Sequence, residues 1–257
     1  MNPRRGLHLF IGLLASLFLA CPARAELADT IAHIKPSLVV VGTFNKLKSP
    51  SFAMRGSGFV VGDGRLVATN AHVVPEGGGG ESGQDALMVL ARHGEETRPY
   101  PAQLVARDAE HDLAILRIAG PQLPAVKIGA SDAVREGQSI AFSGFPIGGA
   151  LGFSPVTHRG IISAITPIAI PIGNSQELKN KSIRRLRSGA FPIFQLDATA
   201  YPGNSGGPLF DVDSGQVLGV INMVFVKSTK EAVLEKPSGI SYAIPANYLR
   251  DLLANTK

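Results

Sequence analysis

Short apolar runs separated by turn residues recur along almost the whole chain. Runs bounded by Gly, Pro, Asn and Asp, rich in Val and Ile, are typical of β-strands. Helical spacing of apolar residues is found only near the two ends, at residues 26–34 and 245–253. We therefore predict an all-β protein of barrels or sandwiches, since no strand–helix alternation is present. The predicted strands lie at residues 37–43, 57–61, 65–69, 86–91, 102–107, 113–118, 139–143, 159–165, 192–196, 208–210, 217–226 and 240–244.

A connector at residues 119–126 divides these strands into two groups. Each group suits one barrel of about 100 residues. We predict a first barrel over residues 26–122 and a second, with a closing helix, over residues 123–257. Three further segments are predicted loops: polar residues 45–56, residues 75–85 with four consecutive glycines at 77–80, and a long segment at 167–189 with a basic stretch at 179–187. The basic stretch is either a solvated loop or a contact for acidic partners or anionic lipid.

The first 25 residues differ from the rest of the chain. Arg4 and Arg5 precede an apolar run at residues 7–20, which ends in small residues at 23–25. This order is typical of a secretory signal peptide. The apolar run is shorter than a membrane-spanning helix normally requires. We predict a mature chain of residues 26–257 without an integral membrane anchor. A retained anchor and a lipid attached to Cys21 are the alternatives.

Removal of this segment changes the composition. Cys21 is the only cysteine, so the mature chain would enter an oxidising compartment without disulfides. Three arginines also leave, so Lys and Arg fall from 25 to 22 against 20 Asp and Glu, and the net charge falls from +5 to +2. The high isoelectric point is therefore poor support for a nucleic-acid partner, and none is predicted. The predicted location is the periplasm or the exterior.

Ser205 stands among three glycines and an asparagine, between apolar runs at residues 190–196 and 217–225, in the sequence AYPGNSGGPLF at residues 200–210. Glycine allows unusual backbone angles and the close approach of a second chain. A serine among glycines is exposed, on a backbone that can turn its N–H groups inward. Acyl transfer needs such N–H groups to meet an oxyanion. A glycine-rich turn without chemistry is the alternative.

A serine nucleophile needs a base and a group that orients the base. Five of the six histidines follow residue 25. His72 lies at the C-terminal end of a strongly β-forming run, just before the glycine-rich loop, and is the candidate base. Asp112 opens a buried strand and is the candidate orienting carboxylate. Asp108 is the weaker candidate. The remaining histidines are expected outside the site: His33 on a terminal helix, His93 in a charged loop, His111 on the opposite face from Asp112, and His158 in a polar turn.

Chain order separates the known arrangements of serine hydrolases. The spacing of Gly203, Ser205 and Gly207 matches the nucleophile elbow of α/β-hydrolases, but no histidine follows the serine, as that fold requires. An order using Asp63, His72 and Ser205 belongs to an α/β fold, which this chain does not suit. The order His72, Asp112, Ser205 on an all-β chain remains.

Three stretches in this order resemble the catalytic motifs of trypsin-like serine peptidases, and most closely those of the HtrA/Deg branch. They are TNAHVV at residues 69–74, HDLAIL at 111–116 and GNSGGPL at 203–209. The resemblance continues at GFVV (58–61), GFPIG (144–148), GIISA (160–164) and GISYAIP (239–245). It implies two six-stranded antiparallel β-barrels with the active site in the cleft between them.

The resemblance also implies a role for each site residue. Ser205 would attack the scissile carbonyl, His72 would carry the proton, and Asp112 would fix the imidazole tautomer. The backbone N–H groups of Gly203 and Ser205 would form the oxyanion hole. Asn204 stands where the digestive branch carries Asp, so activity is expected without zymogen cleavage.

The chain departs from the pattern of this branch in two respects. It ends at Lys257, where most HtrA-type proteins continue into PDZ domains, and residues 26–56 offer only Phe44 and Phe52 as an aromatic cluster for trimer formation. The oligomeric state is therefore left open. By position, the specificity pocket is assigned to Ala200, Val224 and Phe225. None is charged, so an apolar residue is expected before the scissile bond.

We predict a serine endopeptidase that cuts unfolded or exposed protein segments. A catalytically weak binding or chaperone-like module is the first alternative, and an esterase or acyltransferase the second. No metal site and no cofactor are predicted, because the histidines are scattered, the mature chain has no thiol, and the glycine run at 77–80 lacks the Lys of a phosphate loop.

Overall fold

The computed structural model describes residues 26–76, 85–94, 96–147, 153–167, 191–222 and 239–256. The predicted signal peptide, the glycine run at 77–80 and the basic stretch at 179–187 lie outside these residues. So do two of the three predicted pocket residues, Val224 and Phe225.

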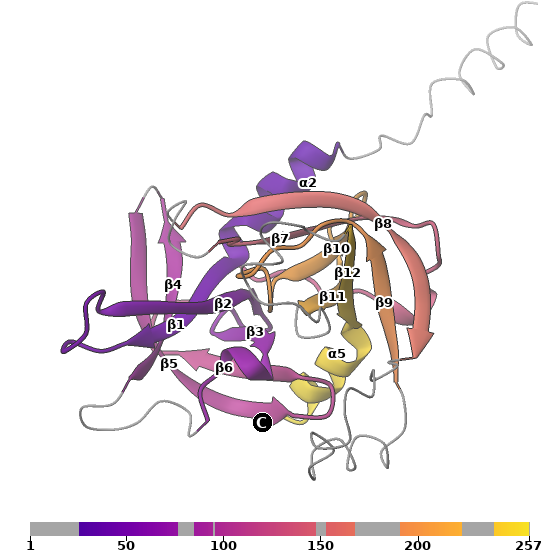
Figure 1. The fold of residues 1–257 in the computed structure, drawn as a ribbon. Helices are drawn as coiled ribbons and strands as arrows, with labels where there is room; N and C mark the ends of the chain where they lie inside the picture. The colour runs from indigo at the N-terminus through magenta and orange to yellow at the C-terminus, as the bar shows by residue number, and fades with distance from the viewer. Residues whose placement is uncertain are drawn as a thin grey trace, which may run out of the picture.

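The described strands form two closed barrels of six antiparallel strands each (Figure 1). This confirms the predicted all-β fold. The first barrel has the order β1-β2-β3-β6-β5-β4 and the second the order β10-β11-β12-β9-β8-β7. The strands are β1 (Leu38–Phe44), β2 (Phe52–Val61), β3 (Leu66–Asn70), β4 (Ala86–His93), β5 (Glu96–Asp108), β6 (Leu113–Ile118), β7 (Ser139–Gly144), β8 (Val156–Pro167), β9 (Pro192–Asp197), β10 (Pro208–Asp211), β11 (Val217–Asn222) and β12 (Ile240–Pro245).

Several strands are apolar on both faces because each face packs against a different core. In β1, Val39 and Val41 belong to a cluster that contains no strand residue of the second barrel. Leu38 and Val40, on the opposite face, belong to a cluster shared by both barrels. Successive side chains of a strand point to opposite faces, so such a strand is buried on both sides. This explains why β1 begins with an uninterrupted apolar run, residues 38–41.

The helices attach to the outside of the barrels. In α2 (Leu27–Ile34), the hydroxyl of Thr30 donates to the carbonyl of Val212 in the second barrel at 2.9 Å. Helix α5 (Ala246–Ala254) contacts β5 and β6 of the first barrel and β11 and β12 of the second (Figure 1). The 3₁₀ turns are η1 (Lys35–Ser37), η2 (Ala71–Val73) and η3 (Ser131–Ala133). No helix in the described ranges is long and apolar enough to cross a membrane.

Two local predictions were wrong. Residues 52–56 were assigned to a loop but form the start of β2, where Phe52 pairs with Phe44 of β1. His158 was assigned to a polar turn but lies within β8, opposite Phe142 of β7. In both cases the polar local sequence is outweighed by pairing with an apolar strand elsewhere in the chain.

The turn before β10 packs directly on the first barrel at Gly206. Its φ is +86°, and a β-carbon there would overlap the Ser57 carbonyl oxygen and the Thr69 hydroxyl oxygen. Its own N–H donates to the carbonyl of Ile221 at 2.9 Å. Only glycine satisfies both the backbone conformation and this close approach.

We predict that Gly206→Ala destabilises the protein much more than Gly137→Ala. Gly137 has nearly the same φ, +83°, but a β-carbon there would meet nothing within 4 Å. Both variants therefore incur the positive-φ penalty, about 1–2 kcal/mol. Only Gly206→Ala adds overlap between the barrels, typically about 1–3 kcal/mol more. Urea unfolding of the two purified variants measures the difference, and equal midpoints would contradict the proposed close contact.

Candidate active site

The pairing of β3 with β6 brings the predicted base and its carboxylate together. Asn70, the last residue of β3, lies opposite Leu113, the first residue of β6. His72 follows β3 within the η2 turn, and Asp112 directly precedes β6. Two residues 40 positions apart therefore lie side by side at one end of the first barrel.

Both oxygens of the Asp112 carboxylate bind His72. The backbone N–H of His72 donates to Oδ1 at 2.9 Å, and ring atom Nδ1 lies 2.6 Å from Oδ2. A carboxylate facing Nδ1 requires the proton on that nitrogen, which leaves Nε2 as the acceptor of the neutral ring. The His72 side chain is 33% exposed and that of Asp112 11%. The base is therefore accessible while its partner is covered.

Asp112 adopts a left-handed backbone conformation, with φ at +54°. This region is uncommon for residues other than glycine, although Asp and Asn tolerate it. The Asp112 carbonyl accepts from the Ala71 N–H at 3.0 Å and from the Asn70 side-chain amide at 3.1 Å. The same short segment that carries His72 thus holds Asp112 in this conformation.

Asn222 is a site residue that the sequence analysis missed. It is fully buried at the end of β11, and its amide donates to Asp112 Oδ2 at 2.7 Å. It connects the second barrel to the carboxylate. A polar residue closing an otherwise apolar strand is the signal that could have identified it.

Ser205 is the last residue of a segment that contains a tight turn and that we call the serine turn, residues 201–205. The N–H of Asn204 donates to the Tyr201 carbonyl at 3.0 Å, and Gly203 has φ at +105°. A proline followed by a positive-φ glycine is characteristic of a type II β-turn, and residues 202 and 203 are Pro and Gly. The sequence of this turn therefore determines its backbone conformation.

The serine turn lies close to the segment that carries His72. A β-carbon on Gly56 would be 2.7 Å from Val73 and 2.9 Å from the Ser205 carbonyl oxygen. That carbonyl accepts a hydrogen bond from the Ser57 N–H at 2.8 Å. Gly56 thus contacts both the residue after His72 and the candidate nucleophile. Ser205 is itself buried, so the predicted exposure of this serine was wrong: the close approach that its glycine neighbours allow covers the residue.

Two arginines hold the backbone that follows His72. Arg55 donates to the carbonyl of Val73 at 2.6 Å and to that of His72 at 3.3 Å. Arg107 donates to the carbonyls of Val74 and Pro75, at 3.0 and 3.2 Å. Charged donors make stronger hydrogen bonds than neutral ones, so the backbone of residues 72–75 is held firmly in place. Neither arginine was among the site residues predicted from the sequence.

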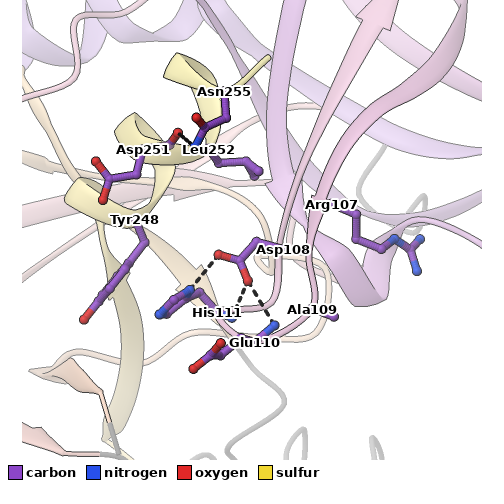
Figure 2. Close-up of a pocket in the computed structure, with 9 residues that line it drawn as sticks. All are labelled: Arg107, Asp108, Ala109, Glu110, His111, Tyr248, Asp251, Leu252 and Asn255. Atoms are coloured by element: carbon purple, nitrogen blue, oxygen red, sulfur yellow. Dashed lines mark hydrogen bonds and ion pairs between the residues drawn. The ribbon is translucent and has the colours of Figure 1, made fainter. Parts of the chain in front are cut away.

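The weaker candidate Asp108 pairs with His111, not with His72. His111 Nδ1 lies 2.6 Å from Asp108 Oδ2, and the ring stacks on Tyr248 with centroids 3.9 Å apart. Figure 2 shows this pair at the edge of a pocket of about 430 Å³ between the β5–β6 turn and α5. Partial burial raises the pKa of the Tyr248 phenol.

His158 lies next to Tyr201 of the serine turn. Its ring stacks on Phe142 with centroids 4.8 Å apart and lies 5.9 Å from the ring of Tyr201. Burial lowers the pKa of the His158 imidazole, which favours its neutral form. Ala200, the predicted pocket residue that the structure describes, is buried in the second-barrel core, and its N–H donates to Ser241 at 2.8 Å.

Within the described part of the chain, no group of three or more His, Cys, Asp or Glu side chains is arranged to hold a metal ion.

Comparison with known proteins places the chain in a family. Residues 56–220 match the model of the trypsin-like peptidase domain. A probable periplasmic serine endoprotease DegP-like from Halomonas elongata is 34% identical over 197 residues, which are 77% of this chain and 34% of that protein. The mitochondrial serine protease HTRA2 of Drosophila pseudoobscura is 34% identical over 204 residues, 79% of this chain and 39% of that protein.

A solved structure agrees with these relatives. An HtrA-type protease, AlgW with tripeptide, superposes with a TM-score of 0.63 at 28% identity, over 90% of this chain and 63% of that one. The chain spans about a third of the length of the curated relatives it matches. The fold, the order of the three motifs and these similarities lead to one conclusion: the chain belongs to the trypsin-like serine peptidases, in the HtrA branch.

Proposed function

We propose that the protein is a serine endopeptidase that hydrolyses peptide bonds through Ser205, His72 and Asp112. The observation that carries this proposal is the Asp112 carboxylate. It accepts hydrogen bonds from His72 and from Asn222, and so from both barrels, at the place where the serine turn meets the first barrel.

Each residue has a distinct part in the reaction. Ser205 Oγ attacks the carbonyl carbon of the scissile bond while its proton passes to Nε2 of His72. Asp112 keeps the other ring proton on Nδ1 and stabilises the imidazolium. His72 then gives the proton to the leaving amine. Water, activated by the same base, hydrolyses the acyl-enzyme and restores the serine.

The Gly203 N–H is the first proposed oxyanion donor. In a trans peptide the C=O and N–H groups point in opposite directions. The carbonyl of Pro202 accepts from the Ile147 N–H at 2.7 Å, so the Gly203 N–H of the same peptide is directed to the opposite side. A β-carbon on Gly203 would overlap the Phe145 carbonyl oxygen, which explains the glycine.

The Ser205 N–H is the second proposed donor, by the same reasoning. The carbonyl of Asn204 accepts from the Gly207 N–H at 2.9 Å, so the N–H of Ser205 points the other way. Two donors directed at a developing oxyanion stabilise the tetrahedral intermediate more than the substrate.

The specificity pocket is assigned to Ala200, Val224 and Phe225. Buried Ala200 lies two residues before Pro202 and so next to the serine turn, and the three side chains are apolar. An apolar wall cannot neutralise a buried Lys or Arg side chain. The proposed substrates are unfolded or exposed polypeptide segments with a small or medium apolar residue before the scissile bond. Relatives named periplasmic support a place in the periplasm, as does the predicted signal peptide.

Loss of Ser205 or His72 should abolish turnover. We expect Ser205→Ala and His72→Ala each to lower kcat on denatured casein by about 10⁴-fold or more. A fluorophosphonate should add once to the unaltered protein, measured by intact mass, and not to Ser205→Ala.

His111→Gln is the matched control, because His111 also has a carboxylate 2.6 Å from Nδ1 but lies in a separate pocket. It should keep most of its activity. Cleavage of small esters without cleavage of casein would contradict the endopeptidase proposal. A folded protein with neither adduct nor cleavage would favour the binding module.

Asn222→Ala should slow catalysis without preventing folding. A hydrogen bond to a charged group contributes about 1.5–3 kcal/mol, so kcat should fall roughly tenfold to a hundredfold. Asn45→Ala is the control, because the Asn45 amide donates to Asp85 at 2.8 Å, away from the site. Equal kcat values for the two variants would exclude a role of Asn222 in positioning Asp112.

Cleavage of a peptide library should follow uncharged residues. Because the three proposed wall residues carry no charge, mass spectrometry of the products should show Ala, Val or residues of similar size before the cut. Prevalent cleavage after Lys or Arg would refute this pocket assignment and leave the catalytic residues untouched.

A further inference from the structure

Ser57 of β2 is fully buried and bonds the serine turn through two groups. Its hydroxyl donates to the Gly203 carbonyl at 2.6 Å, and its N–H donates to the Ser205 carbonyl at 2.8 Å. The hydroxyl also accepts from the Phe145 N–H at 2.9 Å, and the Ser57 carbonyl accepts from the Thr69 hydroxyl at 2.7 Å. Each polar group of this residue therefore has a partner.

Four consecutive carbonyls, from residue 202 to residue 205, accept hydrogen bonds and so fix four successive peptide planes. Three of the donors are backbone N–H groups, and only the bond to Gly203 comes from a side chain. The donors, in the order of the carbonyls, are Ile147 N–H, Ser57 Oγ–H, Gly207 N–H and Ser57 N–H.

We propose that Ser57 is a positioning residue for the oxyanion hole: its hydroxyl sets the orientation of the peptide between Gly203 and Asn204. The inference rests on the proposed function, because it concerns the N–H groups assigned there to the oxyanion. Ser57 belongs to the first barrel, which also carries His72, whereas the serine turn belongs to the second. The hydroxyl therefore aligns the oxyanion donors with the base.

Glycine makes this restraint necessary. Gly203 has no side chain to limit its φ and ψ, so its peptide planes are held only by their hydrogen bonds. Without the hydroxyl, the Gly203 carbonyl and the Phe145 N–H would both lack a protein partner in a buried place. A buried unpaired group is costly, so the turn would rotate to find another partner. That rotation moves the neighbouring N–H donors away from the reacting carbonyl.

The neighbours of Ser57 leave no room for a substitute contact. A β-carbon on Gly56 would lie 2.9 Å from the Ser205 carbonyl oxygen, and one on Gly58 would lie 3.0 Å from the Ala68 carbonyl oxygen. The β2 strand is thus pressed against the serine turn on one side and against β3 on the other. The hydroxyl of Ser57, between the two glycines, is short enough to reach the Gly203 carbonyl within this narrow space.

The test compares Ser57→Ala with the unaltered protein on an internally quenched peptide that the unaltered protein cleaves. Misplacement of catalytic groups by about 1 Å costs on the order of a hundredfold. We expect kcat to fall about tenfold to a hundredfold. KM should change less than about threefold, because ground-state binding does not use the oxyanion donors. A peptidyl boronate places an oxygen in the oxyanion hole, so its binding affinity should fall by the same factor as kcat.

Ser131→Ala is the control for the loss of a buried hydroxyl that makes two hydrogen bonds. Ser131 Oγ lies 3.0 Å from Asn247 Oδ1 and accepts from the Asn247 N–H at 2.9 Å, between η3 and α5. This variant should lose a similar amount of stability and keep its kcat. Ser57→Cys keeps a weak donor of similar size, so its kcat should lie between those of serine and alanine. It also serves as the test variant if Ser57→Ala does not fold.

The outcomes separate this inference from the proposed function. A folded Ser57→Ala or Ser57→Cys protein with kcat within twofold of the unaltered protein would overturn the role of Ser57 and leave the endopeptidase proposal standing. An equal loss of kcat in Ser131→Ala, or a rise in KM alone, would make Ser57 merely structural and also overturn it. An unaltered protein that neither cleaves peptides nor reacts with a fluorophosphonate would overturn the proposed function itself.

Discussion

The carboxylate of Asp112 joins the two barrels at the place where the chemistry is proposed. Oδ2 accepts from His72 of the first barrel and from Asn222 of the second, and Oδ1 accepts from the His72 backbone. An anion that is mostly buried is tolerated only when such donors surround it, and losing one leaves a costly unpaired charge. A shift of one barrel against the other would therefore disturb the buried anion and the orientation of the imidazole together.

The apolar contact between the barrels supports this arrangement. Phe59 and Ile115 of the first barrel share one buried cluster with Phe210 and Ile244 of the second. Each barrel also has a cluster of its own, formed by the opposite faces of its strands. The described residues thus form three core clusters, and the shared one packs the barrel that carries Ser57 against the barrel that carries the serine turn. The hydrogen bonds at the site set the relative orientation of the two barrels, whereas the burial of apolar side chains supplies most of the free energy of their contact.

The fold could be predicted from the sequence because the patterns that indicate each strand are local. Alternation, β-branched runs and Gly or Pro turns mark each strand within a few residues. The order of the three motifs then selected the family. The bonds from Asn222 to Asp112 and from Ser57 to Gly203 were not predictable in the same way, because they connect residues 110 and 146 positions apart. A serine between two glycines, and an asparagine ending an apolar strand, were nevertheless visible signals.

The two His–Asp pairs show why a short distance alone does not define a site. Both have Nδ1 2.6 Å from a carboxylate oxygen. Asp108 and His111 lie three residues apart in one tight turn, where the Asp108 carboxylate also accepts the backbone N–H groups of Glu110 and His111. This is how an Asp ordinarily stabilises a turn.

The surroundings of the two imidazoles differ more than their hydrogen bonds do. The His111 ring is covered on one face by Tyr248 and at its edge by Phe191, and the side chain is 18% exposed against 33% for His72. A base must reach its substrate, and it needs a nucleophile and oxyanion donors beside it. Only the His72 pair lies where a serine turn from the other barrel arrives. A catalytic His–Asp pair is thus distinguished from a structural one by what the other barrel places beside it, and not by the geometry of the pair itself.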